Sequence, residues 1–227
     1  SLFRRGMKLI AVSVGKPRAV PDKRRGEVRT GIWKTPVAGP VRVGRPNLAG
    51  DGQADLVNHG GADKALYAYP AEHYPLWARE LGRDDLAPGG FGENLTTAGL
   101  LEPAVCIGDR FRIGTAVLEV SQPRTPCFKL GLRLGDPGMV KRFLASGRCG
   151  FYLRVVAEGE LAAAAAIERI ARGEGAMTVS EVNWLMHWGR EEHAGAARAA
   201  ALPALAESWR AEFSGRMSAD PLRSRGA

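Results

Sequence analysis

The sequence predicts a mainly β fold, a barrel or sandwich, followed by a small unit of three helices. Past residue 160 the composition becomes rich in alanine, and helical periodicity dominates from Thr178 onward. Before that point, short apolar segments are separated by glycine, proline and asparagine, a spacing typical of all-β domains rather than of alternating strands and helices. A chain of 227 residues is long enough to bury a stable core without a metal or a disulfide. The short apolar segments are 7–15, 31–34, 36–43 and 56–57.

Two elements in the first part of the chain follow from apolar patterns. The continuous run over 7–15 is short and ends at Gly15, which indicates a buried strand. The segment 71–82 places apolar residues at positions i, i+3, i+4 and i+7, which predicts an amphipathic helix. These residues are Tyr74, Trp77, Ala78 and Leu81.

A β-hairpin is expected over 105–120, because apolar residues alternate with arginines before a turn at Gly114–Thr115. A helix near 138–147 and a strand over 151–156 are expected to follow it. The run of alanines within 161–170 favours a helix by intrinsic propensity alone.

The end of the chain predicts the helical unit. Thr178 and Glu181 have the spacing of a capping box at the start of a first helix. Alanine-rich segments near 190–201 and 203–214 predict two more helices, with Pro203 in the first turn of the last one. We therefore expect a barrel domain over 7–172, a three-helix unit over 176–215 and a tail over 216–227.

Positive charge is concentrated near the start of the chain. The formal net charge is +8, and residues 1–30 hold nine Lys and Arg against two Asp and Glu, which is +7 of that total. We expect this basic strand and loop to belong to the barrel. The loop between Lys16 and Arg29 is either a solvated surface or a collector of an anionic ligand such as the phosphate of a cofactor. No aromatic residues are interleaved with its charges, so no nucleic-acid partner is expected.

The cysteines and the hydropathy pattern predict a cytoplasmic protein. Three cysteines are an odd number without CxxC spacing, which argues against a disulfide framework and favours a reducing compartment. No stretch approaches 18 consecutive apolar residues, and no signal peptide precedes the first strand, so no membrane partner is expected.

Cys127 is the leading candidate for chemistry. It stands just after a predicted strand, with Arg124 and Lys129 close by, and neighbouring cations stabilise a thiolate, which is both a nucleophile and a soft metal ligand. The alternative is a small buried apolar residue, the common state of a free cysteine. Cys106 and Cys149 lie in apolar strand contexts and are expected in the core.

Two glycine-containing loops carry the other candidate residues. In the first, His59 precedes Gly60 and Gly61, which let backbone N–H groups approach a ligand, and Lys64 follows as a charge for an anion. The alternative is that His59 has only a structural role. The second loop is weaker evidence for a binding site. It is a nest-like turn of glycines that could hold an anion, followed by a carboxylate and an amide. Its candidates are Gly92, Glu93 and Asn94.

These clusters, in this order, resemble the MOSC domain family, named for the C-terminal domain of molybdenum cofactor sulfurase, and in particular its YiiM-like branch. The segment from Thr178 to about Phe213 is similar to the three-helix appendix of that branch. The resemblance implies a mainly β, barrel-like domain with a few helices. The matching stretches are Gly50–Asp55, His59–Ala65, Phe91–Leu95, Ile107–Asp109 and Gln122–Cys127.

The resemblance further implies a molybdenum cofactor, a molybdopterin whose metal is held by the Cys127 thiolate. The implied activity is reduction of N-hydroxylated compounds such as 6-N-hydroxylaminopurine by N–O cleavage, a detoxification, with His59 as proton donor. Electrons would come from a separate flavin or iron–sulfur reductase, because the chain has neither a cluster-binding cysteine set nor a dinucleotide fingerprint. The implied cofactor contacts are Gly60, Gly61, Lys64, Gly92, Glu93, Asn94, Arg124 and Lys129.

Two alternatives from other classes stay open. The chain could be a molybdopterin-binding or carrier module without turnover, or Cys127 and His59 could be a nucleophile and base for sulfur or acyl transfer. A monomer and a homodimer are both compatible with the sequence. At Ala164–Ala165 the chain departs from the Gly-Asp turn that is frequent in the family. There we follow the resemblance, which implies a turn and a strand, rather than the helical propensity.

Overall fold

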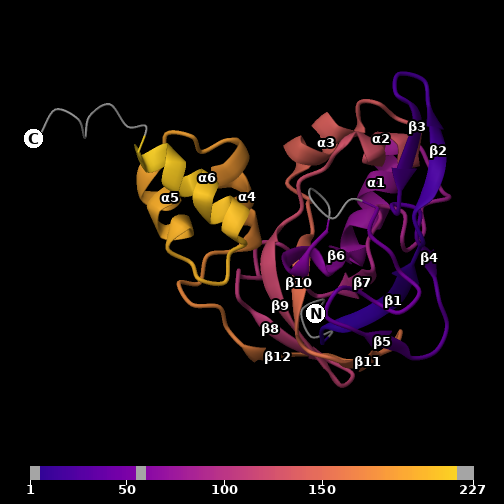
Figure 1. Cartoon of the computed structure of the whole chain (residues 1–227), viewed down its shortest axis with the longest axis horizontal. Helices are drawn as coiled ribbons and strands as arrows, with labels where there is room; N and C mark the ends of the chain where they lie inside the picture. The colour runs from indigo at the N-terminus through magenta and orange to yellow at the C-terminus, as the bar shows by residue number, and fades with distance from the viewer. Residues whose placement is uncertain (1–5, 55–59, 219–227) are drawn as a thin grey trace, which may run out of the picture.

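The computed structural model describes residues 6–54 and 60–218, and their elements form a mainly β domain with a helical unit at its C-terminal end (Figure 1). The strands are β1 (Lys8–Val14), β2 (Arg18–Asp22), β3 (Gly26–Thr30), β4 (Thr35–Pro36), β5 (Val41–Val43), β6 (Leu66–Pro70), β7 (Leu95–Ala98), β8 (Arg110–Ile113), β9 (Ala116–Pro123), β10 (Phe151–Ala157), β11 (Gly159–Leu161) and β12 (Ile167–Ala171). The helices are α1 (Tyr74–Leu81), α2 (Phe128–Leu134), α3 (Met139–Ser146), α4 (Val179–His187), α5 (His193–Ala200) and α6 (Glu207–Ser218).

A large mixed sheet closes on itself, which confirms the predicted barrel-like fold. Its strand order is β12-β8-β9-β10-β6-β7-β1-β4, and only the β6–β7 pair among these is parallel. The two sides meet because Leu9 N donates to Ala165 O at 2.9 Å and Ile167 N donates to Met7 O at 2.9 Å. The residues just before and at the start of β12 therefore pair with β1.

The predicted strands and helices of the barrel domain are mostly present. The hairpin β8–β9 turns at Gly114–Thr115, as its alternating pattern predicts. The amphipathic helix α1 is confirmed, preceded by a single 3-10 turn, and its Trp77 is buried and stacks on Phe143 of α3 at 5.9 Å between ring centroids. The apolar segment 31–34 is not a strand, and 56–57 lies outside the described residues.

The alanine run before β12 forms a turn and a strand rather than a helix. Ala164 adopts a left-handed conformation with φ of +67°, and its N–H donates to Leu9 O at 2.8 Å. Pairing with β1 and β8 satisfies the backbone of this segment, and this tertiary pairing overrides the helical propensity of alanine. The turn and strand implied by the resemblance are confirmed.

The basic segment near the start of the chain is a β-hairpin, not the loop that we expected. β2 and β3 pair from Arg18↔Thr30 to Asp22↔Gly26 and form a separate two-stranded sheet. Of the described residues of this segment, those of β1 belong to the barrel sheet and those of β2 and β3 do not. The Asp22 carboxylate accepts hydrogen bonds from the backbone N–H groups of Arg24 and Arg25 and so stabilises the turn.

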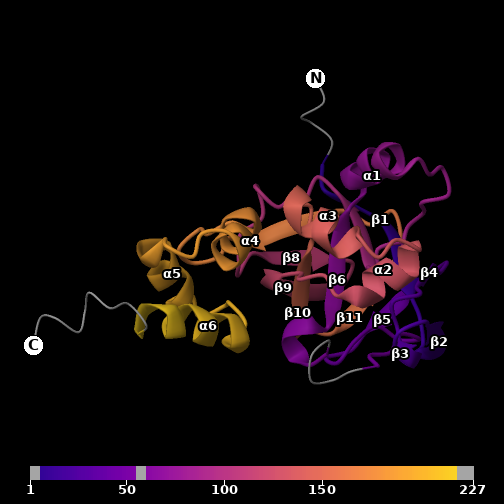
Figure 2. The same ribbon diagram turned by 90° about the horizontal axis from the view of Figure 1, so that it is seen from above.

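The helices α4, α5 and α6 form a unit beside the barrel (Figures 1 and 2). Thr178 Oγ1 accepts the Glu181 N–H at 3.0 Å, the side-chain cap that the sequence predicts. Pro203 is not in the first turn of the last helix, which begins at Glu207. The chain first makes a turn in which Ala206 N donates to Ser121 O of β9 at 3.0 Å. Because this hydrogen bond holds the turn against the barrel, the helix begins only after it.

Candidate functional site

A cavity of about 700 Å³, counting its open mouth, brings together residues from all three sequence clusters. Cys127 and Arg124 come from the segment after β9, Lys64 from the turn before β6, and Gly92 from the loop before β7. The residues Thr30 to Ile32, which end and follow β3, form another part of the wall. Segments that are far apart in sequence meet there because β6, β7, β9 and β10 belong to one sheet.

Cys127 differs from the other two cysteines by facing this cavity. It is half-buried and precedes α2, where its carbonyl oxygen accepts the Leu130 N–H at 2.9 Å. Cys106 and Cys149 are buried in the core, as expected, and burial raises the pKa of both thiols. All three are free, so Cys127 is the thiol available to a ligand in the cavity.

Arg124 is a buried cation that has no carboxylate partner within the described part of the chain. It is 5% exposed, and its guanidinium lies over the rings of Tyr67 and Phe143, each at 5.0 Å from the centroid. Nη2 reaches Phe91 O at 3.5 Å, and Nη1 has no hydrogen-bond partner in the same residues. A buried charge normally requires a counter-ion, so this side of the cavity is suited to an anionic ligand.

Two lysines add positive charge to the cavity wall. Lys129 is half-buried and lies on the first turn of α2, and Lys64 is half-buried beside Gln53. Of the glycines predicted to approach a ligand, Gly61 donates its N–H to Gln53 Oε1 at 3.3 Å, and neither Gly60 nor Gly61 is among the described residues that line the cavity. His59 lies outside the described residues.

The glycine-rich loop before β7 lines the cavity through Gly92 and Asn94. Gly92 has φ of +83°, and a Cβ there would stand 2.6 Å from Ile32 Cγ1, so glycine is required for this close approach. The Asn94 amide is used within the protein: Nδ2 donates to Asp51 Oδ2 at 2.9 Å, and Oδ1 accepts the Tyr67 N–H at 3.1 Å. Asn94 therefore orients the wall of the cavity.

Glu93 does not face the cavity, contrary to its expected role as a ligand contact. It is fully buried, and its carboxylate accepts hydrogen bonds from the Tyr74 hydroxyl, from Gly89 N at 2.8 Å, from Phe91 N at 3.1 Å and from Thr96 Oγ1 at 2.9 Å. Burial raises the pKa of this carboxyl group. With its oxygens occupied by neighbouring donors, Glu93 holds the loop in shape.

Sequence reasoning missed a buried ion pair in the cavity wall. Lys34 is 9% exposed, and its ammonium group pairs with Asp51 Oδ1. Asp51 also accepts the Gly15 N–H at 2.9 Å and the Asn94 amide, and burial lowers the pKa of Lys34. Asp51 stands in one of the stretches that carry the family resemblance, whereas no sequence pattern distinguishes Lys34 from other lysines.

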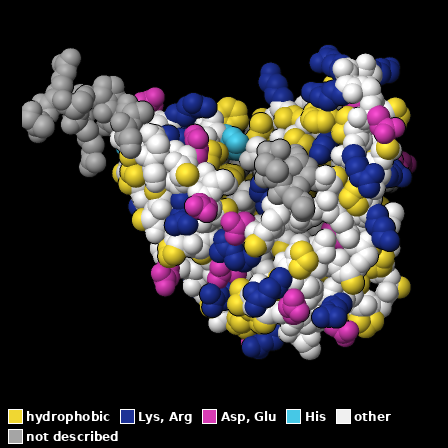
Figure 3. All heavy atoms as spheres, viewed as in Figure 1, with side chains coloured by type: hydrophobic (Ala, Val, Ile, Leu, Met, Phe, Trp, Pro, Cys, Tyr) yellow, Lys and Arg dark blue, Asp and Glu magenta, His cyan; other side chains and the backbone are white. Residues whose placement is uncertain are grey.

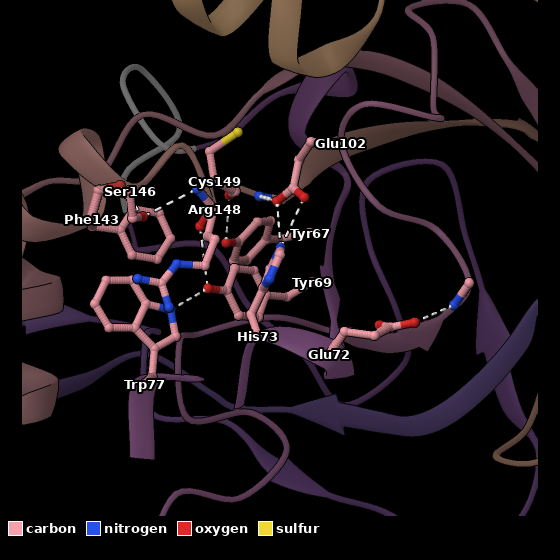
Figure 4. Close-up of polar contacts among 12 residues, drawn as sticks. Tyr67, Tyr69, Glu72, His73, Trp77, Glu102, Phe143, Ser146, Arg148 and Cys149 are labelled. Atoms are coloured by element: carbon pink, nitrogen blue, oxygen red, sulfur yellow. Dashed lines mark hydrogen bonds and ion pairs between the residues drawn. The ribbon is translucent and has the colours of Figure 1, made fainter. Parts of the chain in front are cut away.

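A buried polar cluster surrounds the segment that precedes β10 (Figure 4). Tyr69 Oη donates to Arg148 O at 3.2 Å and Tyr67 Oη donates to Cys149 O at 2.8 Å. The Glu102 carboxylate, paired with His73 at 2.9 Å, accepts the Gly150 N–H at 2.7 Å. Gly150 O in turn accepts the Arg124 N–H at 3.3 Å, so this cluster links the segment before β10 to the cavity.

The donor set of the cavity fits a metal-containing anionic cofactor. A thiol is a soft ligand, and the buried Arg124 guanidinium, together with Lys64 and Lys129, suits phosphate or other anionic groups. No group of three or more His, Cys, Asp or Glu in the described parts of the chain is placed to hold a metal ion alone. A metal in this cavity would therefore need further ligands from its cofactor. None of the described helices is long and apolar enough to cross a membrane.

Comparisons with protein families agree with the fold. The model of the MOSC domain matches residues 55–168, and the model of the YiiM-like 3-alpha helix domain matches residues 177–219. The crystal structure of YiiM from Geobacillus stearothermophilus superimposes with a TM-score of 0.80 at 38% sequence identity, covering 93% of this chain and 99% of that one.

Two curated relatives differ in how much they share with the chain. The uncharacterised protein YflK of Bacillus subtilis is 45% identical over 205 residues, which are 90% of this chain and 92% of that protein. A protein named reductase from Gibberella moniliformis is 40% identical over 139 residues, which are 60% of this chain but 25% of that protein. The similarity to the reductase is therefore confined to part of each protein.

Proposed function

The chain belongs to the MOSC domain family, and on that premise we propose that it is a molybdenum-cofactor-dependent reductase of N-hydroxylated compounds. One support is the shared segment with a relative named reductase. The observation that carries the proposal is that Cys127 lines the same cavity as Arg124, a buried cation without a carboxylate partner among the described residues. A thiol beside a buried cation for which the described residues provide no counter-ion suits an anionic ligand with a soft metal better than it suits a purely structural role.

In this proposal, Cys127 Sγ is the protein ligand of the molybdenum. A thiolate suits a metal whose other ligands are sulfur atoms of a pterin. Arg124, Lys129 and Lys64 hold the anionic groups of the cofactor, and Gly92 lets the loop before β7 approach it. Gly60 and Gly61 shape the turn before Lys64. Glu93 and Asn94 do not contact the cofactor in this proposal; they hold the loop before β7 and the cavity wall in position.

The bound cofactor would supply two-electron redox chemistry at the N–O bond of the substrate. The reaction consumes two electrons and two protons, releases water, and converts a hydroxylamine into an amine. This chain orients the substrate within the cavity, and His59 is the proposed proton donor to the departing oxygen. A separate flavin or iron–sulfur reductase supplies the electrons. Removal of a toxic base analogue such as 6-N-hydroxylaminopurine would be a detoxification.

The test is product formation by protein purified from a host that makes the cofactor. With reduced methyl viologen as electron source, the unaltered protein should convert 6-N-hydroxylaminopurine to adenine, measured by chromatography. Cys127→Ser should abolish the conversion, and Cys106→Ala, which changes a thiol buried outside the cavity, should retain it.

Other outcomes separate the alternatives. Protein that holds molybdenum and pterin but forms no adenine would be a carrier module. Rapid alkylation of Cys127 near neutral pH in metal-free protein, with no bound molybdenum in any preparation, would favour sulfur or acyl transfer.

A further inference from the structure

The β2–β3 hairpin presents positive charge that the proposed cofactor contacts do not use. Its Lys and Arg side chains are exposed, and dark blue side chains gather over this hairpin in Figure 3. The hairpin has two acidic residues: Asp22, which accepts hydrogen bonds from the backbone of the turn and pairs with Arg25 at 3.8 Å, and Glu27, which is exposed on β3. No carboxylate in the described segments forms an ion pair with Lys23 or Arg24. The exposed cations are Arg18, Lys23, Arg24, Arg25 and Arg29.

The hairpin is fixed at the rim of the cavity. The Arg25 guanidinium lies over the Phe128 ring at 4.0 Å, and Phe128 directly follows Cys127. At the other end, Thr30 and the two residues after it line the cavity. A Cβ at Gly52, another lining residue, would stand 2.6 Å from Pro17 Cδ, so the start of the hairpin packs closely on the cavity wall.

A partner that delivers electrons has to reach this rim. The proposed reaction needs two electrons, and the sequence has no cluster-binding cysteine set or dinucleotide fingerprint of its own. Electron transfer slows steeply with distance, so a donor must dock beside the mouth of the cavity. A basic rim at that position attracts and orients a protein with an acidic surface.

We propose that the β2–β3 hairpin is the docking surface for an acidic electron-donor protein. This inference rests on the proposed function. The charge complementarity acts mainly on association, so the hairpin raises the rate of encounter and is sensitive to salt. A nucleic acid is a poorer fit, because the nearby Trp33 ring, which could stack on a base, already contacts the guanidinium of Arg18 at 4.8 Å and lies 5.9 Å from that of Arg133.

The experiment uses purified acidic flavodoxin as the probe and compares two triple variants. The first variant neutralises the tip of the hairpin by combining Lys23→Gln, Arg24→Gln and Arg25→Gln. The matched control neutralises three exposed arginines on β5, on the loop after it and on β8, at the other end of the barrel (Figure 1). The control substitutions are Arg42→Gln, Arg45→Gln and Arg112→Gln.

Two readouts are expected to change together. In titrations of metal-free protein with oxidised flavodoxin at low salt, the hairpin variant should bind at least about tenfold more weakly than the unaltered protein, and the control within about twofold. In the reductase assay, KM for reduced flavodoxin should rise by a similar factor and lose its salt dependence. The rate with reduced methyl viologen and the molybdenum content should stay unchanged.

Several results would overturn the inference. Absence of saturable flavodoxin binding by the unaltered protein would contradict the docking role, and so would equally weak flavodoxin binding by both triple variants. Loss of molybdenum in the hairpin variant, with flavodoxin binding intact, would indicate that the hairpin captures the cofactor. Loss of oligonucleotide binding with flavodoxin binding intact would indicate a nucleic-acid surface. Absence of adenine formation with viologen would instead count against the proposed function, because the titration reports docking independently.

Discussion

Two buried charges lie in neighbouring loops near the cavity, and their surroundings differ. The Glu93 carboxylate lies outside the cavity and accepts hydrogen bonds from two backbone N–H groups and two hydroxyls. The Arg124 guanidinium lies in the cavity wall, where Nη1 has no partner among the described residues. Both are almost inaccessible to solvent. Burial alone therefore does not distinguish a residue that shapes the fold from one that meets a ligand.

The difference lies in whether the charge is satisfied by the protein. A buried charge with all its partners contributes to stability, whereas one without a counter-ion costs free energy in the absence of a ligand. We therefore assign Glu93 to the fold and Arg124 to ligand binding. This assignment predicts that removal of the charge destabilises the protein at Glu93 and weakens ligand binding at Arg124.

The largest expected effect on stability is that of Glu93→Gln. The substitution places an amide N–H₂ among groups that are themselves donors, so the free energy of unfolding should fall by about 3 kcal/mol. Chemical denaturation of the metal-free protein measures this change. A loss below about 1 kcal/mol would show that the four contacts contribute little and would remove the basis of the comparison.

A smaller effect is expected from Thr96→Val, which removes one donor to Glu93 and keeps the shape of the side chain. The Thr96 Oγ1 contact is 2.9 Å long and buried, so its loss should lower the free energy of unfolding by about 1.5 kcal/mol. Thr97→Val is the matched control, because the Thr97 hydroxyl is buried without a hydrogen-bond partner among the described residues. Equal losses in the two variants would contradict the role of Glu93 as an organising acceptor.

The smallest effect on stability is expected from Arg124→Met. Loss of the contacts with two aromatic rings is offset by removal of a buried charge that has no carboxylate partner in the described part of the chain, so the free energy of unfolding should change by less than about 1 kcal/mol. The same variant should retain several-fold less cofactor after purification from a cofactor-producing host. A destabilisation as large as that of Glu93→Gln, with cofactor content unchanged, would reverse the assignment.

The barrel and the position of Cys127 could be predicted from the sequence because both depend on local patterns. The β8–β9 hairpin has alternating residues and a glycine turn, and Cys127 stands just after β9 between the cations Arg124 and Lys129. The turn at Ala164 could not be predicted from propensity, since its conformation depends on pairing with the distant β1. Only the resemblance to a family indicated a turn and a strand there.

The roles of individual polar residues were harder to predict. Glu93 and Asn94 are adjacent in a loop of glycines, and nothing in the sequence shows that one turns into the protein and the other lines the cavity. The Lys34–Asp51 ion pair could not be predicted because the two residues are distant in sequence and come together only in the folded protein. The start of α6 was misplaced because the tie from Ala206 to β9 is a tertiary contact.

The most direct test is metal and pterin analysis of the protein and of Cys127→Ser, both purified from a host that makes the cofactor. We predict about one molybdenum and one pterin per chain in the unaltered protein, and loss of most of the molybdenum in the variant, because its hydroxyl is a poor ligand for a metal in a sulfur-rich shell. Equal molybdenum content in both proteins would contradict the assignment of Cys127 as the metal ligand.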